Sequence, residues 1–292
     1  MVIETHPSPD EGHGLPVTDE QVDAFRRDGF VVVPGLLSDE ELDRLRPEVD
    51  AGVGRRKARD ARSLAEKSRY EREFIQCINL WEDCDGVRPL TFHQGVAGAA
   101  ARLLGVERLR IWHDQALYKE PGGSPTDGHQ DAPYWPIAET DQITAWIPLD
   151  GSTLTGGAMG YVPGSHRMGV EKFVNIFGEE PPEDLLASEE LQGRQPVFVE
   201  VPRGGVAFHH SLTFHVAKPN TTDGVRRVYT VIYMRDGCTR GTPRRHFSVD
   251  RAGIEVGAVI ASEFTPVIWP RTDLPEPPPR PESSFGGALP MR

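Results

Sequence analysis

The sequence contains little cysteine: Cys77, Cys84 and Cys238 are the only three in 292 residues. An odd, small number without a spacing motif argues against a disulfide scaffold. The chain also lacks an apolar run of about 18 residues, which a membrane-spanning helix requires. Its first residues are acidic and polar, without the apolar core of a signal peptide. These absences favour a reduced, cytoplasmic protein that does not enter a membrane.

Positive charge is scarce as well. The 32 Lys and Arg residues are outnumbered by 44 Asp and Glu residues, and the net charge is -12. Such a chain repels phosphate backbones, so nucleic acid is not an expected partner. The one basic stretch, residues 55–72, is interleaved with acidic residues and predicts a solvated helix face. A small molecule is the expected partner, and the sequence gives no indication of oligomeric state.

Glycine and proline, by contrast, are abundant, at 30 and 26 residues, and they favour a turn-rich, strand-rich fold. A hydrophobic content of 38% supports one large domain. We expect a disordered leader over 1–16, a single domain over 17–265 and a Pro-rich flexible tail over 266–292. Within the domain, 169–195 is a long insertion, either a lid over the substrate or a surface excursion.

Two helix starts are expected near the amino terminus. Thr18 with Gln21, and Ser38 with Glu41, match the capping-box pattern, and a short buried strand lies between them. A third helix is expected over 91–104, ended by Gly105.

Strands dominate the rest of the chain. From about residue 107, short apolar runs are separated by Gly and Pro, which is typical of a β-sandwich or barrel. Residues 74–81 alternate like a strand and carry the polar side chains of Gln76 and Asn79. These two would either line a pocket or make structural hydrogen bonds.

Three residues suggest a metal site. Residues i and i+2 of an extended segment point to the same side, so His129 and Asp131 would bind one ion together. His215 would complete a set of two histidines and one carboxylate. That set leaves coordination positions for a bidentate co-substrate and O2, as iron(II) oxygenase chemistry requires. An isolated H-x-D is a weak signal, however, and is commonly a surface turn.

Arg226 lies eleven residues after His215, in an apolar run. It shares a face with Val228 that would point into the core. A buried guanidinium needs an anionic partner, and a dicarboxylate would supply one. The alternative is a surface arginine on an edge strand. Since Arg227 lies on the opposite face, one of the two arginines must point outward.

Four stretches carry a resemblance: DGFVVVPGLLSDEELDRL, GHQDAPYWP, TAWIPLDGSTLTGGAMGYVPGSH and VPRGGVAFHHSLTFHVAKPNTTDGVRRVYTVIY. In these the chain resembles the phytanoyl-CoA dioxygenase family of Fe(II)/2-oxoglutarate oxygenases. The resemblance implies a mainly β fold with flanking helices and a double-stranded β-helix core, the jelly-roll also seen in cupins. It implies that His129, Asp131 and His215 ligate iron(II), and that Arg226 holds the distal carboxylate of 2-oxoglutarate. O2 is the other co-substrate.

The same resemblance places two more residues at the co-substrate. Gln115 matches a position that contributes to the 2-oxoglutarate pocket, and Trp146 matches a pocket tryptophan. In one departure, Ala217 stands where the family often has a small hydroxyl residue. One hydrogen bond to the co-substrate is then either missing or supplied instead by Thr144 or Tyr118.

The expected reaction is hydroxylation of a small organic substrate, with release of succinate and CO2. Asp131 disfavours a halogenase, in which Gly or Ala at this position opens a site for halide. Desaturation and cyclisation remain alternatives, as does a non-catalytic cupin-like metal-binding protein, which would have no use for Arg226. Among the other histidines, His210 is expected to be structural, and His113 has no ligand spacing.

Overall fold

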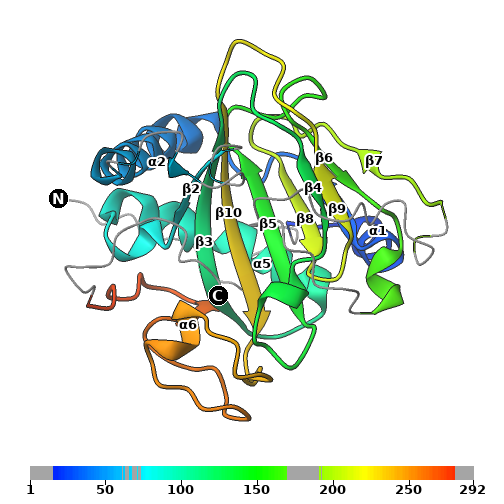
Figure 1. Ribbon diagram of the computed structural model, residues 1–292. Helices are drawn as coiled ribbons and strands as arrows, with labels where there is room; N and C mark the ends of the chain where they lie inside the picture. The colour runs from blue at the N-terminus through cyan, green and yellow to red at the C-terminus, as the bar shows by residue number, and fades with distance from the viewer. Residues whose placement is uncertain are drawn as a thin grey trace.

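The computed structural model describes residues 16–60, 62, 66–67, 71, 74–169, 191 and 193–279. These residues form two antiparallel sheets with helices around them (Figure 1). The larger sheet has the order β1-β8-β5-β10-β3-β11, and β2 also pairs with β3. Its strands are β1 (Phe30–Val33), β2 (Ile75–Ile78), β3 (Leu109–Lys119), β5 (Gln142–Pro148), β8 (Val206–His210), β10 (Arg226–Arg235) and β11 (Val267–Trp269). The smaller sheet has the order β4-β9-β6-β7, with strands β4 (Thr126–His129), β6 (Met159–Tyr161), β7 (Val197–Phe198) and β9 (His215–Ala217). The expected mainly β, jelly-roll core is confirmed.

Most of the α-helices pack on one face of the larger sheet, and the last one lies at the other face. The α-helices are α1 (Asp19–Asp28), α2 (Asp39–Arg59), α4 (Arg88–Thr91), α5 (Gln94–Leu104) and α6 (Phe247–Asp250). The 3-10 helices are η2 (Leu80–Glu82), η3 (Asp85–Val87), η4 (Ala132–Tyr134) and η5 (Ser165–Met168). Both expected capping boxes are present, at Thr18 and Ser38. Helix α5 ends at Gly105, whose left-handed φ of 75° suits glycine.

Strand alternation decides which side chains reach the helices and which reach the interior of the jelly-roll. On β5, Ile143, Ala145 and Ile147 join the core formed with α1, α2 and α5. Thr144 and Trp146, between them, face a cavity on the other side of the sheet. Strands β3 and β10 turn further residues toward this cavity: His113, Gln115, Leu117, Arg226, Thr230 and Ile232. The hydrophobic core therefore lies behind the sheet, and the polar side chains gather in front of it.

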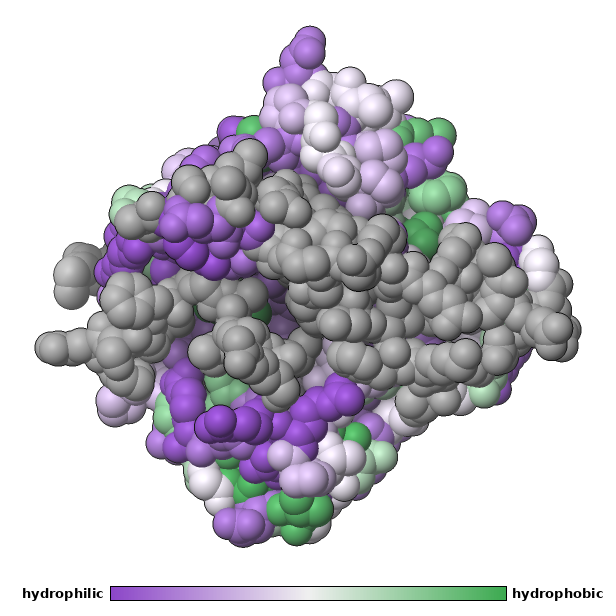
Figure 2. Space-filling view, in the orientation of Figure 1, coloured by the Kyte–Doolittle hydropathy of each residue, from purple (hydrophilic) through white to green (hydrophobic). Residues whose placement is uncertain are grey.

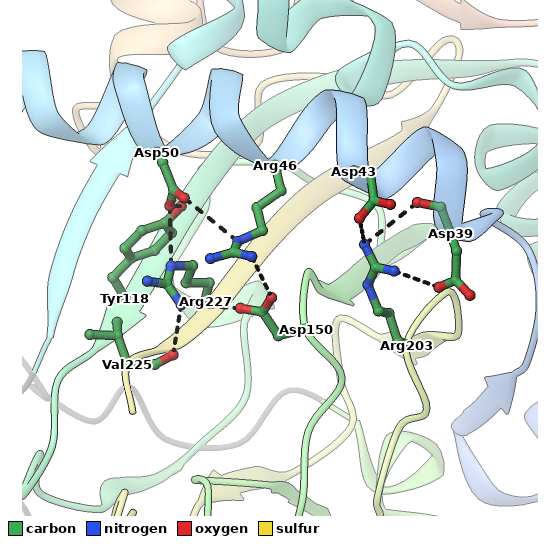
Figure 3. Close-up of polar contacts among 9 residues, drawn as sticks. All are labelled: Asp39, Asp43, Arg46, Asp50, Tyr118, Asp150, Arg203, Val225 and Arg227. Atoms are coloured by element: carbon green, nitrogen blue, oxygen red, sulfur yellow. Dashed lines mark hydrogen bonds and ion pairs between the residues drawn. The ribbon is translucent and has the colours of Figure 1, made fainter. Parts of the chain in front are cut away.

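Ion pairs fasten α2 to the edge of this assembly (Figure 3). Arg227 pairs with Asp50 of α2 and with Asp150, each at 3.2 Å. Arg46 reaches Asp150 at 3.2 Å, and the Tyr118 hydroxyl donates to Asp50 at 2.6 Å. Further along the helix, Arg203 pairs with Asp39 and Asp43. Hydrophilic residues also dominate the surface over α2, at the upper left of Figure 2. Exposed pairs of this kind contribute little stability individually, but together they fix the position of the helix.

The prediction of a flexible tail over 266–292 is wrong for its first residues. Residues 267–269 form β11, which pairs with β3. Ile268 is fully buried, and a Cβ on Gly98 of α5 would come within 2.9 Å of the Trp269 ring. The sheet therefore extends past residue 265. Residues 280–292 lie outside the described residues, as do 1–15 of the expected leader and 170–190 of the expected insertion.

Two local expectations also need correction. The strand expected over 74–81 ends at Ile78, because Asn79 adopts a left-handed φ of 54° and η2 follows. In the basic stretch, Arg56 is buried and pairs with Asp83 at 2.8 Å, so this part of the helix face is not solvated. None of the helices in the described part of the chain combines the length and apolarity that a bilayer crossing requires.

Candidate metal and co-substrate site

The smaller sheet brings the three predicted metal ligands together. His129 ends β4 and His215 begins β9, and the two are register partners. Asp131 joins them from the start of η4, and one ligating atom from each of the three residues lies within 4.8 Å of the others. Its Oδ1 is 3.9 Å from His129 Nε2 and 3.8 Å from His215 Nε2. The predicted convergence is present, although Asp131 has helical dihedrals and arrives through a turn rather than by strand alternation.

Backbone carbonyls orient both imidazoles. His129 Nδ1 lies 2.8 Å from the Asp127 carbonyl oxygen, and His215 Nδ1 lies 3.0 Å from that of Thr213. A carbonyl can only accept a hydrogen bond, so each Nδ1 carries the proton and each Nε2 keeps a lone pair. Burial lowers the pKa of both histidines, which keeps them neutral. Neutral imidazoles with free Nε2 atoms are the form that binds metal.

The third predicted ligand, Asp131, is held in place through Oδ2, the carboxylate oxygen that does not face the two histidines. Asp131 Oδ2 accepts hydrogen bonds from Thr144 Oγ1 at 3.1 Å and His209 Nε2 at 3.2 Å. Thr144 and His209 are cross-strand partners on β5 and β8, so the sheet register places both donors over one carboxylate oxygen. Burial would raise the pKa of Asp131, but His215 and His209 lower it below its usual value. The result is an ionised carboxylate with Oδ1 directed at the two Nε2 atoms.

This donor set fits a divalent iron. Two neutral imidazole nitrogens and one carboxylate oxygen form the ligand set of non-haem iron(II) oxygenases, and it leaves positions for other ligands. The three groups also line a cavity of about 590 Å³, from which such ligands would approach. Of the donors to Asp131, Thr144 was expected near the co-substrate instead. The sequence analysis assigns no role to His209 and weighs only its neighbour His210.

Arg226 faces the same cavity and is 7% exposed. Its Nη1 donates to the Gly157 carbonyl oxygen at 3.0 Å, and its guanidinium carbon lies 5.5 Å from the centre of the Trp146 ring. Within the described residues it has no carboxylate partner, and its Nε has no acceptor. Burial lowers its pKa to about 10, so it stays charged at neutral pH. A buried, unneutralised guanidinium matches the requirement for an anionic co-substrate.

The outward arginine of the pair is Arg227, which makes the ion pairs to Asp50 and Asp150 described above. Gln115 and Trp146 both line the cavity, as expected. Gln115 Oε1 accepts from Gln76 Nε2 at 2.5 Å, so Gln76 also belongs to the lining. Asn79 and Tyr118 are not among the residues that line this cavity.

Two solved structures of similar fold belong to alpha-ketoglutarate-dependent enzymes. The chain is similar to the non-haem alpha-ketoglutarate-dependent carbocyclase SnoK from nogalamycin biosynthesis, at 28% identity and a TM-score of 0.73, over 86% of this chain and 96% of that one. It is also similar to the epimerase SnoN in complex with Fe3+, alpha-ketoglutarate and nogalamycin RO, at 26% identity and a TM-score of 0.69, over 86% and 98%. These similarities place it among the 2-oxoglutarate-dependent non-haem iron oxygenases.

The family can be stated more narrowly. The family model for phytanoyl-CoA dioxygenase (PhyH) matches residues 25–228, and the chain belongs to that family. Its cofactors are accordingly iron(II) and 2-oxoglutarate, with O2. A probable alpha-ketoglutarate-dependent hypophosphite dioxygenase from Stutzerimonas stutzeri is 29% identical over 152 residues. That match covers 51% of this chain and 53% of the relative, about half of each.

The hydrogen bonds to Asp131 Oδ2 lead to a prediction about metal affinity. His209→Phe should weaken Co(II) or Fe(II) binding by roughly 10- to 100-fold, the usual cost of removing a partner that orients a metal ligand. Thr144→Val should act in the same direction. Calorimetric titration of metal into the apoprotein would measure both. His210→Asn is the matched control, because His210 accepts from Leu212 N and does not line the cavity. Wild-type affinity in both variants would show that these donors do not position the carboxylate.

Buried histidines lead to a prediction about pH. Burial lowers the pKa of His113 to about 4, from 6.5 in an unfolded chain. Between these values the unfolded state binds the extra proton, so this histidine reduces stability as pH falls from about 6.5 to 4. Burial raises the pKa of Glu82 to about 7, so this carboxyl group increases stability as pH falls. The test therefore compares the pH dependence of stability in the wild type with that in a variant that lacks His113. From pH 6.5 to 5, the urea midpoint should fall more steeply for the wild type than for His113→Phe. Parallel slopes would contradict this.

Proposed function

We propose that this oxygenase hydroxylates an unactivated C–H bond of a small organic substrate, with conversion of 2-oxoglutarate to succinate and CO2. The observation that carries the proposal is the position of Asp131, with Oδ1 3.9 and 3.8 Å from the two histidine Nε2 atoms. A carboxylate there occupies the coordination position that a halogenating relative leaves to halide. Bound iron, with 2-oxoglutarate and O2, supplies the oxidising power for C–H cleavage.

The chain's own residues prepare the site for this reaction. Arg226 holds the distal carboxylate of 2-oxoglutarate, with the Trp146 ring beside it. The carbonyl oxygens of residues 127 and 213 keep both imidazoles in the ligating tautomer. The jelly-roll walls keep bulk water from the reacting groups, since His129 and His215 are only 8% and 4% exposed.

A second oxidative outcome is favoured by a specific observation. The two similar structures described above are a carbocyclase and an epimerase. A ring closure would use the same residues for cofactor binding and take two electrons from the substrate, so only the placement of the substrate would differ from hydroxylation. An epimerisation leaves the substrate at the same oxidation level and would also need a two-electron reductant from solution, such as a thiol. A metal-binding protein without turnover is less well supported, because it would have no need of the buried Arg226.

Two measurements test the proposal. Succinate should form from 2-oxoglutarate only when iron(II) and O2 are both present, and faster when a pool of candidate compounds contains the substrate. Under 18O2, one labelled oxygen in the product indicates hydroxylation. An unlabelled product with a new ring or an inverted centre indicates the second outcome, and a chloride-dependent product indicates halogenation. No succinate under any of these conditions would contradict the enzyme assignment.

A further inference from the structure

The cavity continues past the metal ligands, away from Arg226. This far end, here called the aromatic end, is formed by His113 of β3, Trp135 after η4, and His246 and Phe247 at the start of α6. None of these four residues has a part in binding iron or 2-oxoglutarate as described above. What the aromatic end would bind follows from its polar atoms, its rings, its charges and its size.

His113 provides an unsatisfied polar group. It is 4% exposed and lines the cavity; its Nδ1 is fully buried, and its Nε2, the nitrogen left to face the cavity, makes no hydrogen bond within the described residues. The lowered pKa keeps the ring neutral, so it offers one donor and one acceptor and no charge. A ligand that brings a hydroxyl or carbonyl oxygen to Nε2 would give this nitrogen a hydrogen-bond partner that the described residues do not supply.

Flat rings enclose this imidazole. The Trp135 ring stands edge-on to His113 at 6.2 Å and 84°, and Phe247 lies 5.6 Å from it. His246 is held in place by stacking on Trp112, at 4.3 Å and 18°. Phe247 also lies 4.2 Å from the His246 ring, so the aromatic surface left for a ligand comes mainly from Trp135 and Phe247, which are only partly buried. Aromatic ligands prefer offset and edge-to-face contacts with such rings.

The charges at this end discourage a cation. Asp250 is the carboxylate that lines this end of the cavity, and it already accepts from Arg240 at 2.8 Å and from His246 N at 2.9 Å. Arg251 is paired with Glu82 at 3.0 Å. Arg245, at the mouth, is 86% exposed and lies 3.9 Å from the same Asp250. A positively charged ligand would therefore be repelled by the arginines, and the Asp250 carboxylate is already hydrogen-bonded to other groups.

Size gives the last constraint. The whole cavity of about 590 Å³ is within the range of roughly 300–1,000 Å³ that is typical of sites for drug-sized ligands. A phosphorus oxyanion such as hypophosphite, the compound named for one relative, has a few heavy atoms and would leave most of this volume unfilled.

The geometry points to a planar aromatic compound, bearing a hydroxyl or carbonyl group and no positive charge, as the ligand of the aromatic end. His113 hydrogen-bonds its oxygen, while Trp135, His246 and Phe247 contact its ring. This inference rests on the proposed function in one respect: the compound bound there is the substrate that is oxidised.

Four matched probes test the inference by calorimetry. They are 6-hydroxy-2-naphthoate, 2-naphthoate, decahydro-2-naphthoate and 2-naphthylmethylamine. The protein is saturated with 2-oxoglutarate, so that Arg226 is not available to the carboxylates. We expect 6-hydroxy-2-naphthoate to bind at least tenfold more tightly than the saturated acid and the amine. Its hydroxyl should add about fivefold over 2-naphthoate, the value of one hydrogen bond of about 1 kcal/mol.

The variant His113→Phe isolates the hydrogen bond. It should remove the fivefold advantage of the hydroxyl and leave the binding of 2-naphthoate nearly unchanged. His166→Ala is the control, because His166 lies outside the cavity lining and contacts the Arg26 carbonyl oxygen. This variant should keep the wild-type order of affinities.

Three results would overturn the inference. They are equal binding of the saturated acid, equal binding of the amine, and naphthoate binding that is detected only when 2-oxoglutarate is left out, which would place the naphthoates at Arg226. The proposed function fails in a different way. If no succinate forms but the hydroxylated naphthoate still binds more tightly through His113, the ligand assignment for the aromatic end is supported and the oxygenase reaction is contradicted. If succinate forms but the preference is absent, the reverse holds.

Discussion

Replacement of His129, Asp131 or His215 by alanine should lower the rate of succinate formation by on the order of a thousandfold or more, because each supplies one of the three protein ligands to iron. Asp131→Ala is the most informative of the three. It leaves two neutral imidazoles in a buried site and removes the only carboxylate near their Nε2 atoms among the described residues. A dication is poorly stabilised there without a counter-charge. Metal content after anaerobic loading and the succinate rate should fall together.

The control for this series must keep the fold and the local histidine content. His210→Asn meets that requirement, since residue 210 lies next to His209 on β8 but its Nδ1 serves the backbone of Leu212. It should retain both metal and activity. Full activity in Asp131→Ala, with an unchanged thermal unfolding midpoint, would mean that the triad is assigned to the wrong residues.

The sequence predicts the convergence of His129, Asp131 and His215 because much of the signal is local. His129 and Asp131 are two positions apart, and Arg226 follows His215 by eleven residues at the start of an apolar run. Strand alternation then determines that Arg226 faces inward and Arg227 outward. Both features are visible without knowledge of the sheet order.

The donors to Asp131 Oδ2 could not be predicted in the same way. Thr144 and His209 meet only because β5 and β8 pair in a register that makes these two residues partners. A shift of the register by one residue would turn one of them to the other face. That register depends on packing between strands distant in the sequence. Nothing in the residues next to His209 distinguishes it from His210.

Composition misled the prediction for the carboxyl-terminal segment. The proline residues after residue 269 predict a flexible tail. A short strand, however, needs only a few apolar residues that can pack against the core. Ile268 and Trp269 have such a place, because Gly98 leaves room for the indole against α5. The lack of a side chain at Gly98 thus makes room for a strand that lies about 170 residues later in the chain.

Arg226→Gln should weaken 2-oxoglutarate binding far more than it slows a saturated enzyme. Removal of one partner of a buried, hydrogen-bonded charge pair costs about 2–5 kcal/mol, which corresponds to roughly thirtyfold or more in affinity. The KM for 2-oxoglutarate should therefore rise by at least that factor. Because the guanidinium binds the carboxylate far from the metal, kcat at saturating 2-oxoglutarate should change much less. Anaerobic titration of 2-oxoglutarate into the iron(II) protein would give the binding loss directly.

Arg227→Gln is the matched control for that prediction. It removes the same charge from the adjacent residue, but Arg227 is 26% exposed and pairs with Asp50 and Asp150 rather than facing the cavity. Loss of such exposed pairs costs about 0–1 kcal/mol of stability, and the KM for 2-oxoglutarate should not change. Equal increases in KM for the two variants would indicate a general effect of positive charge at the start of β10. A normal KM in Arg226→Gln would mean that another group holds the co-substrate. Only a large increase confined to Arg226→Gln is consistent with a buried guanidinium that is paired by the co-substrate itself.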